Sequence, residues 1–231
     1  MTLLNETAAR ASDKVFTGSV RPTNRNEKSK LWKAQDAPKK NLRRIDDSSR
    51  ISLRRMLGLP ESGFLFLFVG RTDPVKNLSG ALAAFHLTKS RFDNSHLVLA
   101  PGRDVTAGSG IIGVELAPQK MSQLYRSVDA LIHPSHYDGY SLAVHEALAY
   151  GLPVIVSQGT GAAYYCTNEL NALILPRKHG AALVDALSRL MCLLIESDDL
   201  RSRLSTEAAR KFSVMDWDWV AAETEKAYSS V

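Results

Sequence analysis

From about residue 60 onward, short apolar segments of strand length alternate with longer segments of helical pattern. Phe64–Val69 is apolar at all of its six positions, and Gly70 ends it. Short strands that are apolar throughout are typical of a parallel sheet covered by helices on both faces. The alternation predicts an α/β fold with a single doubly wound, Rossmann-like parallel sheet. The expected strands are 64–69, 96–100, 111–116, 130–133, 153–157 and 172–175.

The segments between these strands have helical periodicity and helix end signals. The expected helices are 47–57, 78–87, 118–127, 141–150, 181–195, 198–212 and 216–228. In sheets of this kind, ligands bind at the carboxyl ends of the strands, at the point where the strand order reverses. The loops that follow strands are therefore where we expect the functional residues.

The net charge of +5 is unevenly distributed along the chain. Residues 1–60 contain 14 Lys and Arg against 6 Asp and Glu, a net +8, whereas residues 61–231 contain 15 against 18, a net −3. The first fifty residues are also poor in large apolar side chains, so they bury too little surface to offset chain entropy. We expect a basic tail over 1–46 and a Rossmann-like domain over 47–231. The tail is either a solvated disordered segment or a contact for anionic lipid, and no nucleic acid partner is expected.

Neither a membrane-spanning segment nor a secretory signal is expected. Apolar runs stay well below the ~20 residues that a spanning helix needs, and the first residues lack the pattern of a signal peptide. Cys166 and Cys192 are too few and too far apart for a zinc cluster or a disulfide framework. We expect a cytoplasmic protein, with peripheral contact at the inner membrane face as an option for the basic tail.

The first strand is followed by Gly70-Arg71 and, five residues later, by Lys76. Gly70 allows a tight turn, and the two cations lie just before a helix that we expect to start near Asn77. Cations beside a helix N-terminus form an anion site. A charged loop after a buried strand is also common without any such role.

A second cluster follows the fourth strand, where Asp138-Gly139-Tyr140-Ser141-Leu142 leads into a helix that contains Glu146. Backbone N–H groups of Gly139, Tyr140 and Ser141 at the helix start would face an anion. The carboxylates of Asp138 and Glu146 would hold hydroxyl groups on either side of a phosphate. Alternatively, Asp138 is a helix cap and Glu146 a solvated or ion-paired helix residue.

Taken in order, several motifs occur together at characteristic spacing. They are Leu57-Gly58-Leu59-Pro60, Gly70-Arg71 with Lys76, Pro134-Ser135, Asp138-Gly139-Tyr140, Glu146-Ala147-Leu148-Ala149 and Gly151-Leu152-Pro153-Val154-Ile155. The series resembles the donor half of the retaining glycosyltransferases of family 4, which have the GT-B fold. The resemblance covers about residues 53–228, including the aromatic-rich helix around Trp217 and Tyr228.

The resemblance implies transfer of a hexosyl group from a uridine or guanosine diphosphate sugar to a glycan or lipid-linked acceptor, as in polysaccharide biosynthesis. It implies that Arg71 and Lys76 bind the diphosphate, that Asp138 faces the donor sugar and that Glu146 holds the ribose. Backbone amides from Gly139 to Leu142 would contact phosphate and sugar. The family usually has Glu at the position of Asp138, so the reach toward the sugar is one methylene shorter here. No metal or other cofactor is implied, and the Asp216-x-Asp218 pair looks like helix capping.

Three other patterns in the sequence point to different chemistry and are set aside. Gly108, Gly110 and Gly113 match G-x-G-x-x-G, but the third glycine falls inside an expected strand rather than a helix. Gly139-Tyr140-Ser141-Leu142-Ala143 approaches a nucleophile elbow, but seven residues separate the preceding strand from the serine. His133, His136, Asp138 and His145 lie on different elements and are not expected to form a metal site.

GT-B enzymes have a second domain that binds the acceptor, and the polar residues before about 60 are not expected to form one. The sequence therefore leaves two classes of function open. One is an enzyme half that needs an acceptor domain, either because it is a truncated or excised part of an enzyme or because a separate chain supplies that domain. The other is a non-catalytic nucleotide-sugar-binding or interaction module, the relic of a truncated glycosyltransferase.

Overall fold

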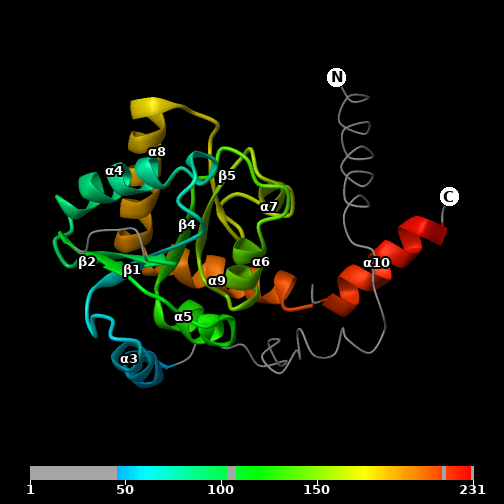
Figure 1. Cartoon of the computed structure of the whole chain (residues 1–231), viewed down its shortest axis with the longest axis horizontal. Coiled ribbons are helices and arrows are strands. Elements are labelled where there is room, and N and C mark those ends of the chain that lie inside the picture. The colour runs from blue at the N-terminus through cyan, green and yellow to red at the C-terminus, as the bar shows by residue number, and fades with distance from the viewer. Residues whose placement is uncertain (1–45, 103–107, 215–216, 230–231) are drawn as a thin grey trace. The chain divides into compact units, whose positions relative to one another are not determined.

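The computed structural model describes residues 46–102, 108–214 and 217–229, and the residues of the predicted tail up to 45 lie outside it. Six parallel strands form one sheet in the order β3-β2-β1-β4-β5-β6 (Figure 1). This is the doubly wound order predicted from the sequence. The strands are β1 (Phe64–Val69), β2 (Ser95–Ala100), β3 (Ile111–Gly113), β4 (Ala130–His133), β5 (Val154–Ser157) and β6 (Leu173–Leu175).

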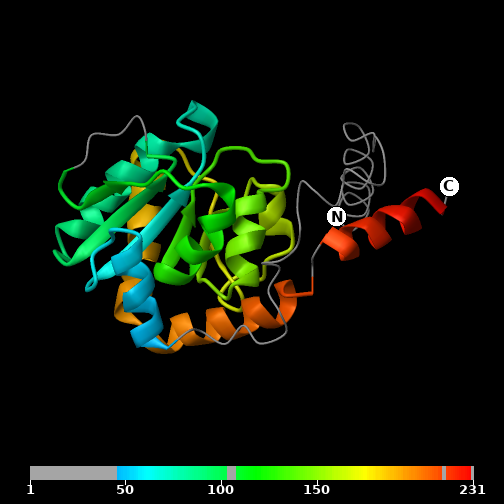
Figure 2. The same ribbon diagram turned by 60° about the horizontal axis from the view of Figure 1, so that its bottom comes forward.

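Helices cover both faces of the sheet (Figures 1 and 2). They are α3 (Asp47–Met56), α4 (Leu78–Lys89), α5 (Met121–Ser127), α6 (Leu142–Ala149), α7 (Gly161–Tyr164), α8 (Gly180–Glu196) and α9 (Asp198–Phe212), with short 3₁₀ turns η1 (Pro74–Lys76) and η2 (Pro118–Lys120). The helices predicted from the sequence are confirmed to within a few residues. The four-residue helix α7 was not predicted, because it is too short to show a helical period.

Alternate side chains of β1 build two separate hydrophobic cores. Leu65 and Leu67 pack in one core with α5, α6 and α7, whereas Phe66 and Phe68 pack in the other with α4 and most of α8. Successive side chains of a strand point to opposite faces, so a strand between two helical layers has to be apolar throughout. This is the physical reason for the six-residue apolar run in the sequence.

Strand β3 is shorter than the predicted span 111–116 and ends at Gly113. There the backbone of Gly102 comes so close that a Cβ on Gly102 would lie 2.2 Å from Gly113 Cα. Only glycine allows two backbones to approach in this way. The turn after β2 therefore closes against the end of β3.

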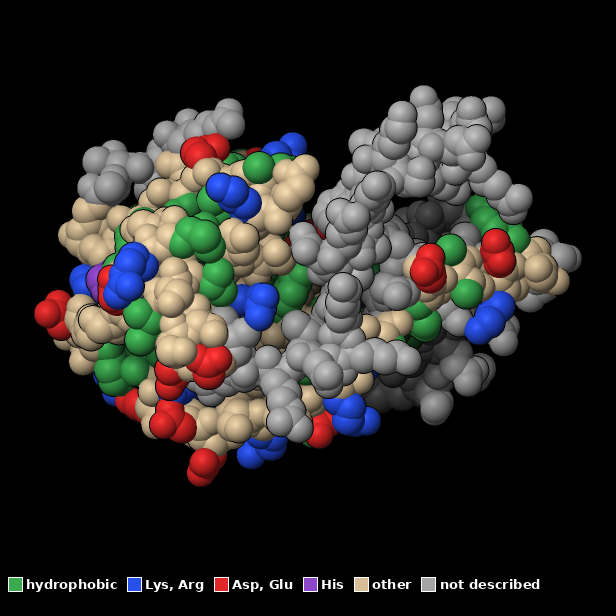
Figure 3. Space-filling view, turned by 90° about the horizontal axis from the view of Figure 1, so that it is seen from below, with side chains coloured by type: hydrophobic (Ala, Val, Ile, Leu, Met, Phe, Trp, Pro, Cys, Tyr) green, Lys and Arg blue, Asp and Glu red, His purple; other side chains and the backbone are tan. Residues whose placement is uncertain are grey.

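Of the described residues, 46–102 and 108–214 belong to the compact unit that carries the sheet, and helix α10 (Trp217–Ser229) does not belong to that unit. Among the described helices, none has the length and apolar character that crossing a membrane would take. On the face seen in Figure 3, acidic and basic side chains of the described residues are interspersed. The predicted domain boundaries at 46 and 47 stay predictions.

Candidate active site at the switch point of the sheet

A cavity of about 350 Å³ opens beside the carboxyl ends of β1 and β4. These two strands are neighbours at the centre of the sheet, and the chain continues from β1 toward β2 but from β4 toward β5. The cavity thus lies at the topological switch point, where ligands bind in sheets of this kind. Its lining residues are Val69, Gly70, Lys76, His133, Asp138, Tyr140, Ser141, Leu142 and Ala143.

The loop after β1 is shaped by its own side chains so that Lys76 reaches this cavity. Gly70 turns the chain with φ 154°, and the Asp73 carboxylate accepts a hydrogen bond from the Lys76 N–H at 3.2 Å. Pro74 starts the 3₁₀ turn that ends at Lys76, as suits its fixed φ and missing N–H. The Lys76 side chain is only 21% exposed.

Asn77 joins the loop after β1 to the loop after β4. It is buried and has a left-handed backbone with φ 56°. Its Oδ1 accepts from Gly80 N–H at 3.2 Å, which caps α4, and its Nδ2 donates to the Pro134 carbonyl at 3.2 Å. A backbone hydrogen bond of 2.8 Å from His136 N–H to the Val75 carbonyl ties the same two loops.

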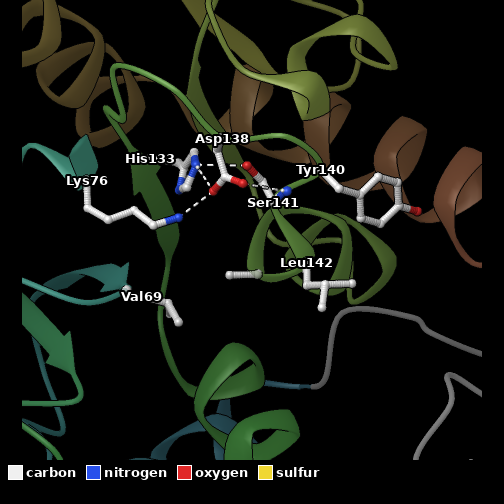
Figure 4. A pocket seen from close by; sticks show the side chains of 9 residues that line it. Val69, Lys76, His133, Asp138, Tyr140, Ser141 and Leu142 are labelled. Atoms are coloured by element: carbon white, nitrogen blue, oxygen red, sulfur yellow. Dashed lines mark hydrogen bonds and ion pairs between the residues drawn. The ribbon is translucent and has the colours of Figure 1, made fainter. Parts of the chain in front are cut away.

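Asp138 is the centre of the polar contacts in the cavity (Figure 4). Its Oδ2 accepts from Lys76 Nζ at 2.5 Å and lies 3.2 Å from His133 Nε2, while Oδ1 accepts from Ser141 N–H at 3.0 Å. Burial by itself raises the pKa of the carboxyl, but the hydrogen bonds from His133, Lys76 and Ser141 outweigh burial and hold the pKa well below its usual range. Asp138 is therefore ionised at neutral pH.

His133 belongs to this site, although the sequence suggested only a buried strand end. It closes β4, is 3% exposed, and its Nε2 lies 2.9 Å from Ser141 Oγ as well as 3.2 Å from Asp138. The signal that would have found it is positional. A polar residue at the last position of a central strand faces the ligand edge of the sheet.

The start of α6 is tightly packed between two loops. Ser141 has φ 60°, and its N–H is already bonded to Asp138. Behind it, Gly161 N–H donates to the Asp138 carbonyl at 2.8 Å, and a Cβ on Gly161 would lie 1.8 Å from the Gly139 carbonyl oxygen. The predicted anion contact from the Ser141 amide would therefore have to replace the Asp138 contact.

Tyr140 lines the cavity, but its ring points away from Lys76 and Asp138 (Figure 4). The ring stacks on His145 with centroids 4.0 Å apart and an interplanar angle of 8°. His145 also meets Tyr165 and Phe212 edge to face. Burial lowers the pKa of His145 and raises that of Tyr140, so the stack is neutral and apolar at pH 7.

Two predicted site residues lie away from the cavity in this structure. The Arg71 side chain is 85% exposed and pairs with Asp73 at 3.0 Å. Glu146 accepts a hydrogen bond of 2.8 Å from the Tyr125 hydroxyl of α5. Burial raises the pKa of Glu146, opposed in part by that hydrogen bond. The structure thus brings together Gly70, Lys76, Asp138, Tyr140, Ser141 and Leu142, but not Arg71 and Glu146. The predicted residue Gly139, between Asp138 and Tyr140, does not itself line the cavity.

No group of three His, Cys, Asp or Glu side chains among the described residues is arranged to hold a metal ion. The prediction that the reaction needs no metal stays a prediction. The arrangement that the structure does provide is one cation and one anion at the mouth of a helix-flanked cavity. Such a site can hold a phosphate on Lys76 and a hydroxyl group on Asp138.

Residues 63–192, more than half of the chain, match the family described as glycosyl transferases group 1. The chain belongs to this family. The match covers the strands and loops that build the cavity, from β1 through α6 and on into α8. The motif series recognised in the sequence therefore identified the broader family correctly.

Relatives in this glycosyltransferase family are similar over most of the chain. A D-inositol 3-phosphate glycosyltransferase of Saccharomonospora viridis is 28% identical over 200 residues, which is 77% of this chain and 46% of that protein. An uncharacterized glycosyltransferase of Methanocaldococcus jannaschii is 24% identical over 191 residues, 78% of this chain and 48% of that protein. The chain thus spans about half the length of the curated relatives it matches.

Solved structures confirm the GT-B type of fold. The C-terminal domain of a group 1 glycosyl transferase from Francisella tularensis has a TM-score of 0.59 at 16% identity, covering 72% of this chain and 95% of that one. The Anabaena protein HepE, solved with UDP and glucose, has a TM-score of 0.62 at 18% identity, covering 80% and 54%. The described sheet therefore has the fold of the Rossmann-like domain of GT-B glycosyltransferases.

Proposed function

We propose that the cavity binds the diphosphate of a nucleotide sugar of the uridine or guanosine type. In this proposal the chain is the donor-binding half of a retaining, family 4 glycosyltransferase. Together with an acceptor-binding domain, it transfers a hexosyl group to a glycan or lipid-linked acceptor. The proposal is supported by membership of the family and by the position of the cavity at the switch point of the sheet.

The observation that carries the proposal is the meeting of Lys76 and Asp138. The two residues are 62 positions apart in sequence, yet Nζ and Oδ2 lie 2.5 Å apart inside the cavity. Both side chains are largely buried, at 21% and 15% exposure. Burying a charge costs free energy, so each of these charges has to be offset by the other or by a ligand. A fixed cation next to a fixed carboxylate is what a ligand with a phosphate and hydroxyl groups requires.

The proposed reaction breaks the bond between the anomeric carbon of the sugar and the diphosphate oxygen. Negative charge builds on the departing diphosphate, and Lys76 stabilises it from a fixed position. Arg71, whose side chain is 85% exposed, joins this site by leaving Asp73. Asp138 accepts a hydrogen bond from a hydroxyl of the sugar, while amides from Gly139 to Leu142 contact phosphate and sugar.

Transfer also needs an acceptor, and we propose that an acceptor-binding domain completes the site. The chain spans 46% of the length of the Saccharomonospora viridis relative, which leaves room in such proteins for a second domain. The acceptor domain would be supplied by further residues or by a separate chain. Without such a domain, we expect the chain to bind the donor but not to transfer the hexosyl group.

A non-catalytic binding or interaction module, which binds nucleotide weakly or not at all, is the second candidate. The observation that favours it is the position of Arg71 and Glu146 away from the cavity. If these residues keep their present partners after binding, the diphosphate meets one cation instead of two and the ribose lacks its proposed carboxylate.

Calorimetric titration with a panel of uridine, guanosine and adenosine diphosphate sugars tests the donor site. We expect one class of nucleotide to bind at micromolar Kd, and Lys76→Ala and Glu146→Ala to weaken it. If the wild type binds none of the panel more tightly than millimolar, the donor site is refuted. If Lys76→Ala weakens binding but Glu146→Ala does not, the assignment of the ribose to Glu146 is wrong.

A cytoplasmic location with peripheral contact to anionic lipid is proposed from the basic charge of the first residues. Co-sedimentation with phosphatidylserine vesicles at low and high salt tests it. Electrostatic binding weakens steeply with salt, so binding that does not respond to salt contradicts the proposal.

A further inference from the structure

His133 faces two groups of the donor site at once. Its Nε2 lies 3.2 Å from Asp138 Oδ2 and 2.9 Å from Ser141 Oγ, and the residue is 3% exposed (Figure 4). A neutral ring uses Nε2 either to donate toward Asp138 or to accept from the Ser141 hydroxyl, whereas a protonated ring only donates. The proton count of this ring therefore determines how firmly it holds Asp138.

The charges around His133 balance only while Lys76 stays on Asp138. Lys76 from η1 and Asp138 from the loop before α6 are the charged residues among those lining the cavity, and Tyr140 is the other titratable one. The strands on either side, β1 and β5, offer apolar or uncharged side chains. Helix α6, which also packs on β4, carries the titratable residues His145 and Glu146. A diphosphate that draws Lys76 away thus adds anionic charge and removes the cation that Asp138 had.

Asp138 then has two remaining partners, Ser141 N–H on Oδ1 and His133 on Oδ2. A carboxylate near a bound diphosphate is disfavoured by like charge, unless a nearby group becomes positive. His133 is the nearby group that can do so, because histidine is the side chain that changes charge near neutral pH.

We propose that His133 is a positioning residue that takes up a proton when a nucleotide diphosphate draws Lys76 away from Asp138, and that the resulting imidazolium keeps Asp138 ionised and in place. The proton comes from solvent, and both ring nitrogens then carry hydrogen, with Nε2–H donating to Asp138 Oδ2. The inference rests on the proposed donor site. It adds that donor binding is coupled to protonation of a residue that need not touch the donor.

The consequence is a pH dependence of affinity with a definite sign. In this proposal protonation of the His133 ring and binding of the nucleotide favour each other. A ligand whose binding takes up a proton binds more tightly as pH falls. Wild-type affinity should therefore increase as pH is lowered from about 8 to about 6.5, and this increase should be lost without His133.

The test is titration of the full chain with uridine diphosphate and guanosine diphosphate at about pH 7.5, in buffers of different ionisation enthalpy. Buffer dependence of the heat gives the number of protons taken up. His133→Gln is the informative variant, because its amide can donate to Asp138 but cannot take up a proton. His86→Gln on the exposed side of α4 makes the same change away from the site. The nucleotide itself also exchanges protons on binding, and this contribution cancels in the difference between the proton uptake of two variants.

We expect the wild type and His86→Gln to take up a larger fraction of a proton than His133→Gln, which should bind about tenfold more weakly. If the three proteins bind with equal proton counts, the inference is overturned while the donor site stands. If none binds either nucleotide, the donor site itself is refuted and the inference with it. Should His133→Gln fail to fold, ¹⁵N resonances of the wild-type His133 ring decide, because at about pH 7.5 they must move toward those of the protonated ring on saturation with nucleotide.

Discussion

Strand β4 has an aspartate at each end, and the two have similar partners but different surroundings. Asp129 precedes the strand and is paired with Arg54 at 2.7 Å and with Arg50, both from α3. It also accepts from Leu65 N–H at 2.8 Å. Asp138 follows the strand and is paired with Lys76 and His133. One aspartate is enclosed by protein, and the other faces a cavity.

The two sites differ in the further contacts that are open to each cation, Arg54 and Lys76. Arg54 is 3% exposed and donates through Nε to the Ser127 carbonyl at 2.7 Å and through Nη1 to the Gly63 carbonyl at 3.1 Å. All three nitrogens of the Arg54 guanidinium thus donate to groups of the folded chain. Lys76 has an open side on the cavity, so its ammonium can exchange Asp138 for a ligand. Similar pairing therefore anchors α3 at one end of β4 and prepares a binding site at the other.

The largest effect is expected from removing the anchoring carboxylate. Asp129→Ala leaves Arg54 buried without a counter-ion, and breaking a buried pair in this way costs about 3 kcal/mol of unfolding free energy. Urea denaturation followed by circular dichroism measures it. Asp138→Asn is the matched comparison and should cost less than about 1 kcal/mol, because Lys76 can turn to solvent. Equal losses would remove the distinction between the two ends of β4.

The next effect concerns ligand affinity rather than stability. Lys76→Ala should weaken binding of the nucleotide diphosphate about 100-fold, since one charge at ~4 Å in a partly shielded site contributes at most about 4 kcal/mol. Calorimetry measures the affinity, and thermal unfolding checks that the fold is intact. Lys120→Ala, which removes an exposed lysine of η2, should bind like the wild type. Unchanged affinity in Lys76→Ala would contradict the proposed role of the cavity.

A third substitution tests whether the two loops must be joined for the site to form. Asn77→Ala removes the cap of α4 and the hydrogen bond to the Pro134 carbonyl, and it places a residue with a Cβ but no local hydrogen bond at φ 56°. We expect the unfolding free energy to fall by about 2 kcal/mol. Asn77→Gly loses the same hydrogen bonds without the backbone strain and should cost about 1 kcal/mol. Both should also weaken nucleotide binding several-fold.

Glu169 has a similar left-handed backbone, with φ 60°, and an exposed side chain. It therefore serves as a control for the effect of placing glycine at such a backbone position. Glu169→Gly should change the unfolding free energy by no more than about 0.5 kcal/mol and leave nucleotide binding unchanged. If Asn77→Gly also leaves binding unchanged, the link between the loops does not position Lys76.

The smallest effect is expected at Glu146. Its pKa is raised in the folded protein, mainly by burial, so folding favours the protonated form, and stability falls as pH rises above the ordinary value of the carboxyl. Glu146→Gln removes this loss while its amide oxygen still accepts from Tyr125. The variant should gain about 0.5 kcal/mol at pH 7 and nothing at pH 4. Thermal unfolding between these values measures the difference, and a gain independent of pH would contradict it.

Much of the fold could be predicted because its signals are local. The apolar run of β1 has the same residue limits in the structure, and β4 was predicted from Ala130 to His133 as observed. Helix α9 was likewise predicted at its observed limits, 198–212. Helix α7 and the early end of β3 were missed, since the first is too short for a period and the second depends on a contact with Gly102.

The candidate site was predicted in part. Gly70, Lys76 and the residues from Asp138 to Leu142 follow strands, and the structure places most of them around one cavity. His133 was missed because its contacts to Asp138 and Ser141 depend on how the loop folds back over the strand. The positions of Arg71 and Glu146 also depend on neighbours, Asp73 and Tyr125, that no motif indicates.

The sequence by itself determined the parallel sheet, the family and the loops in which polar residues would matter. These follow from side-chain periodicity and short motifs, which act over a few residues. Only the tertiary structure decided which charges meet, because Lys76 with Asp138 and Arg54 with Asp129 are 62 and 75 positions apart. A buried ion pair that is enclosed by protein stabilises the fold, whereas one that borders a cavity can also bind a ligand. That cavity exists only once strands β1 and β4 lie next to each other.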